Sequence, residues 1–234
     1  MKYLLKVMTS GILVICVITL YSFSDNFGSK QKLGLTAHRK LSNASANAHT
    51  LNPDSNKIIR SFFLKNFKQQ GDIKVSKVNI NHDTLSILSS GWFFYYPLGM
   101  FHNLTTLRNR LKLLNFKKEY VPDETSPSGK TPLYRFYNDN SFVKYIYQPD
   151  TKNMEIVSGE ITDPSIILRN GTKVGMDKTD FLDLYFSRDT HNATKKINVV
   201  EFISALDGMW HYYNFKNDKL YSICFDTDYQ VDKK

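Results

Sequence analysis

Apolar and polar residues follow two different periods along the chain, and each period predicts a kind of element. Ile59, Phe63 and Phe67 recur every fourth residue, which predicts a helix. Apolar residues then alternate with polar ones at 73–75 and again at 85–87, on either side of a polar turn. This period of two predicts a β-hairpin directly after the helix.

Two stretches of the chain, which begin near Gly99 and Gly175, show the same order of predicted elements. Gly99-Met100 and Gly175-Met176 each precede a stretch with helical spacing, and an aromatic strand pair around an Asn-Asp turn follows each of them, at 133–147 and 211–225. The glycines are offset by 76 residues and the turns, at Asn138 and Asn217, by 79. The repeat predicts an internal duplication of a helix-plus-strands unit.

These elements together predict an α+β fold with an antiparallel sheet and short helices packed on one face. The α+β domain is expected over residues 55–234. The duplicated units are expected at 72–163 and 164–234.

The stretch around Gly175 contains the signals of a helix start. Asp177 is a good N-cap, Asp180 stands at the third position of a capping box, and Met176 and Phe181 have the spacing of a hydrophobic staple. Each polar residue here has a role in folding, so no chemistry is required of the stretch.

The same residues also resemble a known superfamily of exported modules, which includes the beta-lactamase-inhibitor proteins and the small lipoproteins of the outer-membrane assembly machine. The pattern is a Gly-Met turn, a capped helix and a later aromatic strand pair. It lies on Gly175, Met176, Asp177, Phe181 and Leu182, then on Trp210, Tyr212 or Tyr213, Phe215 and Leu220. The resemblance implies helices against an antiparallel sheet, often in tandem, and protein binding without catalysis.

The chain departs from that pattern in two places. The usual Gly-x-Pro after the helix is replaced by "FSRDTHN" at 186–192, and the first unit lacks a clear Trp-x-Tyr strand because Trp92 lies before its helix.

The N-terminus predicts export. Lys2 and Lys6 precede an uncharged apolar run, and small residues stand at the right positions for cleavage after Ser24, so residues 1–24 have the form of a signal peptide. An uncleaved anchor is the main alternative, and lipidation at Cys16 is a third. Residues 25–54 are rich in Ser, Asn and Lys and are expected to form a flexible polar linker. We therefore expect a periplasmic, envelope-associated or extracellular location.

The net charge and the cysteine content limit the binding partners and the redox chemistry that the chain can have. The formal net charge is +9, which behind a signal peptide favours weak association with anionic envelope surfaces over nucleic acid binding. The basic residues Arg108, Arg110, Lys112, Lys117 and Lys118 are explained by a solvated helix face. Removal of the signal peptide would leave Cys224 alone, which excludes an internal disulfide and dithiol redox chemistry.

Known catalytic and ligand motifs are incomplete. "SPSGKT" at 126–131 lacks the first glycine of a phosphate-binding loop and leads into a strand. His211 is explained as a half-buried strand residue, and a pairing with Asp207 and a nucleophile from elsewhere in the chain is the alternative. No metal site, cofactor or catalytic residue is predicted.

The run "SGWFFYYPLGMF" at 90–101 is the most informative candidate site. As a strand it would place Trp92, Phe94 and Tyr96 on one side, and in a later strand Trp210 and Tyr212 alternate with His211 and Tyr213. The five aromatics Trp92, Phe94, Tyr96, Trp210 and Tyr212 are the candidate protein-binding residues. The alternative is a strand that is covered on both faces.

The sequence thus predicts an exported, non-catalytic protein-binding module with an unknown protein partner. Two alternatives stay open: a hydrolase of an envelope polymer that uses carboxylates without a motif, and a membrane-anchored structural domain.

Overall fold

The computed structural model describes residues 53–122, 127–204 and 208–229, and contacts group residues 51–234 into one unit. The predicted signal peptide and the linker up to residue 52 lie outside the described residues. Along the chain the elements are α1 (Pro53–Lys65), β1 (Lys74–Asn81), β2 (Thr84–Ser90), α2 (Trp92–Tyr95), α3 (Leu104–Arg110), β3 (Asn115–Pro122), β4 (Lys130–Tyr137), β5 (Phe142–Gln148), β6 (Asn153–Ile161), α4 (Lys178–Tyr185), η3 (Arg188–Thr190), α5 (His191–Thr194), β7 (Val199–Ser204), β8 (Met209–Lys216) and β9 (Lys219–Thr227).

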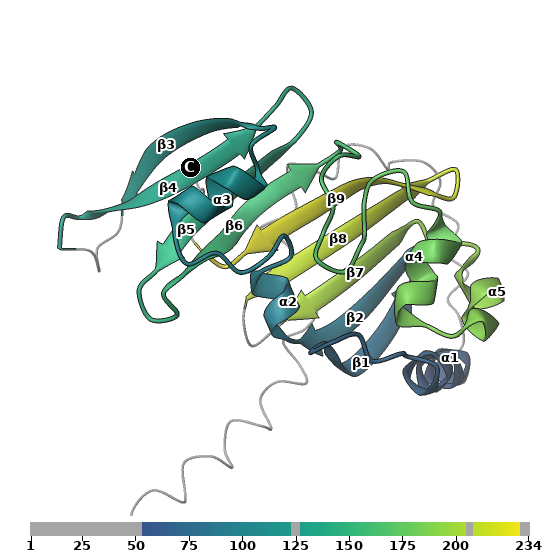
Figure 1. Ribbon diagram of the computed structural model, residues 1–234. Helices are drawn as coiled ribbons and strands as arrows, with labels where there is room; N and C mark the ends of the chain where they lie inside the picture. Colours follow the sequence, from purple (N-terminus) through teal and green to yellow (C-terminus); the bar gives the residue numbers. More distant parts are fainter. Residues whose placement is uncertain (1–52, 123–126, 205–207, 230–234) are drawn as a thin grey trace, which may run out of the picture. The chain divides into compact units, whose positions relative to one another are not determined.

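The strands of the described residues belong to one nine-stranded sheet with the order β1-β2-β7-β8-β9-β6-β5-β4-β3 (Figure 1). The α+β class is confirmed, but the sheet is mixed because β2 and β7 pair in parallel. The predicted antiparallel pairing is found at the other strand pairs, and the pair of β2 with β7 is the exception. Alternation of side chains shows which residues of a strand share a face, but it carries no information on the direction of the neighbouring strand.

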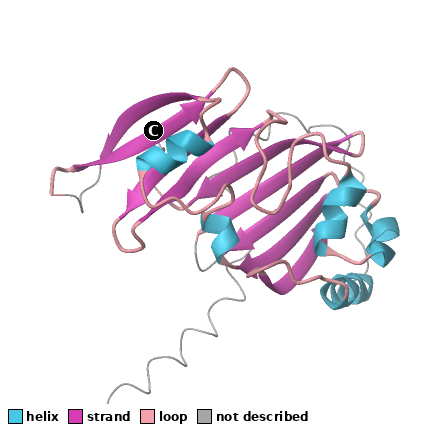
Figure 2. Cartoon of the chain, in the orientation of Figure 1, coloured by secondary structure: helices cyan, strands magenta, loops and turns pink. Residues whose placement is uncertain are grey.

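The helices α2, α3 and α4 lie on the same side of the sheet (Figures 1 and 2). Leu107 of α3 and Phe181 of α4 belong to the same hydrophobic core as Tyr213 and Phe215 of β8. We call this side the helix face and the opposite side the open face. Because successive residues of a strand point to opposite faces, Tyr212 of β8 lies on the open face.

The predicted hairpins are confirmed, although their two Asn-Asp turns differ. Asn217 and Asp218 between β8 and β9 have φ angles of 52° and 56°, as a tight turn of type I′ requires. Between β4 and β5, the side-chain oxygen of Asn138 instead accepts hydrogen bonds from the N–H groups of Asn140 and Ser141. A short helix leads into antiparallel strands twice, at α3 with β3–β6 and at α4 with β7–β9. The duplication itself stays a prediction.

The start of α4 is as predicted, but its cap is different. Asp177 is the N-cap residue, yet its side chain makes no capping hydrogen bond and pairs instead with Lys219 at 2.8 Å. The backbone explains the difference, because Gly175 donates to the carbonyl of Leu220 and Lys178 donates to that of Asp218. The helix start is thus fixed by its docking on the β8–β9 turn.

The predicted strand at residues 92–96 is wrong, because Trp92–Tyr95 form the short helix α2. The carboxylate of Asp72 accepts hydrogen bonds from the N–H groups of Trp92 and Phe93 at the start of this helix. Gly91 precedes it with a φ of 148°, and a Cβ there would lie 2.8 Å from the carbonyl oxygen of Asp72. A cap that comes from 20 residues away leaves no local signal in an aromatic run.

The strands β3–β6 join the rest of the sheet through a short pairing of β6 with β9. β6 and β9 pair only through Gly159, Glu160 and Ile161. A Cβ on Gly159 would lie 2.9 Å from both the carbonyl oxygen of Phe142 and a methyl group of Val143, so the glycine permits the close approach of β5.

We therefore expect Gly159→Ala to lower the free energy of unfolding by about 1–3 kcal/mol, the usual cost of overpacking. Urea unfolding of the variant beside the wild type measures this difference. An unchanged midpoint would show that β5 moves aside without cost.

Candidate binding surface on the open face of the sheet

A row of polar residues crosses the open face in register. Ser86 of β2 pairs with Glu201 of β7, Glu201 with Tyr212 of β8, Tyr212 with Cys224 of β9, and Cys224 with Glu160 of β6. Paired residues in neighbouring strands point to the same face, so these side chains lie side by side. We call them the acidic row.

Glu201 is the central charge of this row. The hydroxyl of Ser86 donates a hydrogen bond of 2.7 Å to its carboxylate. Burial raises the pKa of Glu201, and the hydrogen bonds from Ser86 and Tyr212 offset that rise only in part. Within the part of the chain that the structure describes, no Lys or Arg forms an ion pair with Glu201. A half-buried carboxylate held only by hydroxyls is poorly compensated.

The pKa values of two neighbours of Glu201 in the row, Tyr212 and Cys224, are raised as well. Burial, followed by the charges of Glu201 and Asp226, raises the pKa of Tyr212. Burial, followed by the charge of Glu160, raises the pKa of Cys224 to about 12. The Cys224 thiol is therefore protonated at neutral pH and is a poor nucleophile.

A second row runs beside the acidic row on the same face, two residues further along the strands. Leu88 of β2 pairs with Ile203 of β7, and Ile203 pairs with Trp210 of β8. Ile203 is buried, whereas Leu88 and Trp210 are half-buried. We call these three residues the apolar row. The open face thus presents an apolar stripe next to a negatively charged one.

The other predicted aromatics lie away from this face. Trp92 is 56% exposed on α2, where its indole stacks on Tyr96 with ring centroids 6.1 Å apart. Phe94 and Tyr96 are fully buried, so they have no surface to offer a partner. Trp210 and Tyr212 are separated by one residue in β8, and both are half-buried.

The pairing of β7 with β8 determines the face on which Trp210 and Tyr212 lie. Trp210 pairs with Ile203 and Tyr212 with Glu201, two residues apart on the same face, while His211 between them points to the helix face. Trp210 and Tyr212 are therefore both on the open face.

His211 is more deeply placed than predicted. It is fully buried among the rings of Phe94 and Phe225, and its Nε2 lies 3.0 Å from the carbonyl oxygen of Phe94. Burial lowers its pKa to about 3. The neutral ring donates its Nε2 proton to the carbonyl and is a structural element of the core. Asp207, the considered partner, lies outside the described residues.

Sequence reasoning missed Glu201 and Ser86 as site residues. The signal was present in "VVEFIS" at 199–204, where a charged residue stands in an otherwise apolar strand. Only the strand order places Ser86 beside it, because β2 and β7 are more than a hundred residues apart. The described residues contain no group of three or more His, Cys, Asp or Glu that could hold a metal ion.

In the described part of the chain, no helix is long and apolar enough to cross a membrane. The chain matches no family model, and no curated protein and no solved structure is similar to it.

Proposed function

We propose that this protein is an exported, non-catalytic binding module whose open face takes a polypeptide bearing a lysine or arginine side chain. The observation that carries the proposal is the half-buried Glu201 carboxylate, whose hydrogen-bond partners among the described residues are the hydroxyls of Ser86 and Tyr212, directly beside the apolar row. A cation from a partner would compensate this carboxylate, and an apolar side chain next to it would cover Trp210.

The energetics of interfaces support this arrangement. Tryptophan, tyrosine and arginine are the residues that most often dominate binding energy, in well-packed and desolvated positions. Charge complementarity around them selects the partner and sets its register. The acidic row lies in a protein with a formal net charge of +9, so its local sign is opposite to that of the chain as a whole.

The remaining parts of the proposal rest on the sequence and on the titration of the buried groups. The signal-like residues 1–24 and the resemblance to exported binding modules support export to the periplasm, envelope or extracellular space. Burial keeps the Cys224 thiol protonated and the His211 ring neutral, which supports binding over nucleophilic or acid–base chemistry.

The test compares the two tryptophans of the chain. The protein is immobilised, its partner is captured from the extract of its own cell envelope or medium, and the affinity of the purified partner is then measured. We expect Trp210→Ala to weaken binding by about 30-fold or more, as for a central aromatic contact. Trp92→Ala removes an exposed indole from the helix face and is expected to change the affinity by less than about twofold.

Glu201→Gln measures the contribution of the Glu201 charge to partner binding. The substitution removes a carboxylate that burial disfavours, so we expect unchanged or higher stability together with weaker binding of the partner. Circular dichroism and urea unfolding check that each variant folds. Equal loss of affinity in Trp92→Ala and Trp210→Ala, or full binding by Glu201→Gln, would contradict the proposed surface.

A further inference from the structure

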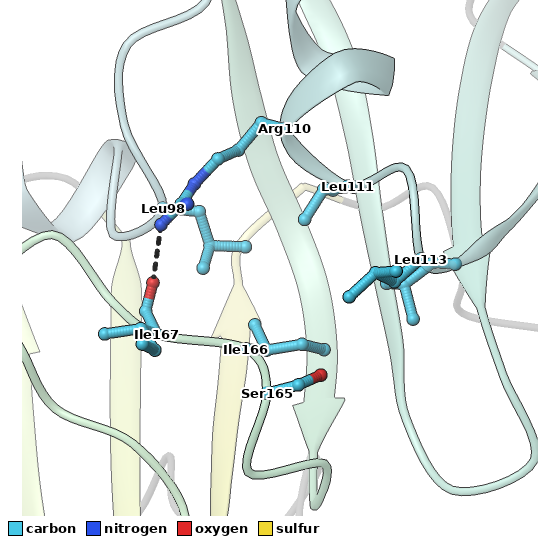
Figure 3. A pocket seen from close by; sticks show the side chains of 8 residues that line it. Leu98, Arg110, Leu111, Leu113, Ser165, Ile166 and Ile167 are labelled. Carbon is cyan, nitrogen blue, oxygen red and sulfur yellow. Dashed lines mark hydrogen bonds between the residues drawn. The ribbon is translucent and has the colours of Figure 1, made fainter.

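A second surface lies on the helix side, where α3 ends. Leu113, in the turn after α3, is 73% exposed, and Ile167, in the loop after β6, is 41% exposed. Both residues line a small hollow, on opposite sides of it, together with Leu98, Leu111, Leu114 and Ile166 (Figure 3). The guanidinium of Arg110 donates a hydrogen bond of 3.0 Å to the carbonyl oxygen of Ile167, which holds the turn and the loop together.

Cations surround these exposed apolar groups. Arg108 and Lys112 line a groove next to the hollow, together with Leu111, Leu114 and Phe116. The sequence from Thr84 to Lys118 contains no Asp or Glu. The local charge is therefore strongly positive.

A chain of contacts extends the cationic surface onto β3 and β4. Arg108 lies over the Phe116 ring at 4.7 Å, and Phe116 stacks on Tyr134. Lys118 lies over the rings of Tyr134 and Tyr120, and Tyr120 is 60% exposed. Lys117 is different, because it points to the open face and pairs with Glu119 at 3.1 Å.

The predicted cluster of five basic residues is therefore divided between the two faces of the sheet. We call the group formed by Arg108, Arg110, Lys112, Leu113, Lys118, Tyr120 and Ile167 the α3 patch.

We propose that the α3 patch binds the surface of an anionic lipid bilayer, with the Leu113 side chain inserted between the headgroups. Exposed aliphatic residues, an interfacial tyrosine and surrounding cations are the combination that peripheral membrane surfaces use. Each Lys or Arg near an anionic leaflet increases binding by about fivefold. This proposal is independent of the open face, which lies on the other side of the sheet.

The hollow below Leu113 is too small to hold the proposed lipid inside the protein. Its volume is about 40 Å³, which suffices for a water molecule or two and not for a lipid chain. Leu113 is therefore not a lid over an internal ligand. Only a partner that comes to the surface can cover its large exposed area, and the cations around it favour a partner that is negatively charged.

The experiment places a local probe in the full chain. Leu113→Cys, in a Cys16→Ser background, is labelled with the environment-sensitive fluorophore NBD and mixed with vesicles of phosphatidylcholine containing 30% phosphatidylglycerol or none. Cys224 is half-buried and its pKa is raised to about 12, so it labels slowly. The same label on Ile58→Cys is the matched control, because Ile58 is an aliphatic residue of α1 with 71% exposure.

We expect a blue shift of the label at position 113 with anionic vesicles only, and no shift at position 58. Charge reversal by Arg108→Glu and Lys112→Glu together is expected to raise the lipid concentration for half-maximal shift by about 25-fold or more. A retained hydrophobic N-terminus would hold the protein on both kinds of vesicle, but it would not move the probe at position 113 into the headgroups. No shift at position 113, an equal shift on neutral vesicles, an equal shift at position 58, or a shift produced by soluble polyphosphate alone would overturn the proposal.

Discussion

Acidification from pH 6.5 to pH 3 is expected to remove about 3–5 kcal/mol of folding free energy through His211 alone. Burial lowers the pKa of this histidine to about 3 in the folded protein, whereas an unfolded chain binds the proton near pH 6.5. Between these two values the unfolded state binds more protons than the folded state. Stability therefore falls as the pH falls through this window, and above pH 6.5 the residue has no effect on the pH dependence.

The measurement is the free energy of urea unfolding at several pH values for the wild type and for His211→Gln. Glutamine does not titrate and can still donate an N–H to the carbonyl of Phe94, which receives the histidine Nε2 proton at 3.0 Å. The variant is expected to lose stability at neutral pH but to lack the histidine part of the slope. His211→Leu, which does not titrate either, is the second variant. Parallel pH curves for wild type and both variants would show that His211 is protonated in the folded state as easily as in the unfolded one.

Glu155→Leu is expected to lower the free energy of unfolding by about 3–5 kcal/mol. Glu155 is buried in β6 and accepts hydrogen bonds from the hydroxyls of Tyr96 at 3.0 Å, Thr151 at 2.8 Å and Tyr229 at 2.8 Å. Burial, then the hydrogen bond to Glu155, raises the pKa of Tyr229 to about 12. Removing the carboxylate would leave the hydroxyl of the buried Tyr96 without its acceptor.

The design separates lost hydrogen bonds from lost packing. Tyr229→Phe removes a single donor and is expected to cost about 1 kcal/mol. A triple variant, Glu155→Leu with Tyr96→Phe and Tyr229→Phe, replaces the acceptor and two of its donors by apolar groups and is expected to recover part of the lost stability. If Glu155→Leu alone is as stable as the wild type in urea, this group of hydroxyls contributes nothing to the fold.

The sequence allowed the elements with a regular period to be predicted. The β1–β2, β4–β5 and β8–β9 hairpins follow from alternation and turn residues, and the start of α4 follows from Asp177. The helix α2 was missed because its cap comes from Asp72, on the far side of the β1–β2 hairpin. Local composition in the aromatic run could not show a contact that forms only when this hairpin brings residues 72 and 92 together.

The candidate surface could be predicted only in part, for a related reason. Trp210 and Tyr212 were identified from the sequence, whereas Glu201 and Ser86 depend on the parallel pairing of β2 with β7. Alternation placed each residue on a face of its own strand. The order of strands in the sheet then determines which residues are neighbours. The alternation of apolar and polar residues within a strand does not predict that order.

The central claim, that the open face binds a partner protein, is tested most directly by site-specific photo-crosslinking. A benzophenone amino acid replaces Trp210 in one variant and Trp92 in another, and both full-length proteins are irradiated in the cells that produce them. A single adduct at position 210 that is absent at position 92, and that weakens when Glu201 is changed to Gln, is the expected result. An adduct at position 92 alone, or the same adducts at both positions, would contradict the account and place the binding surface elsewhere.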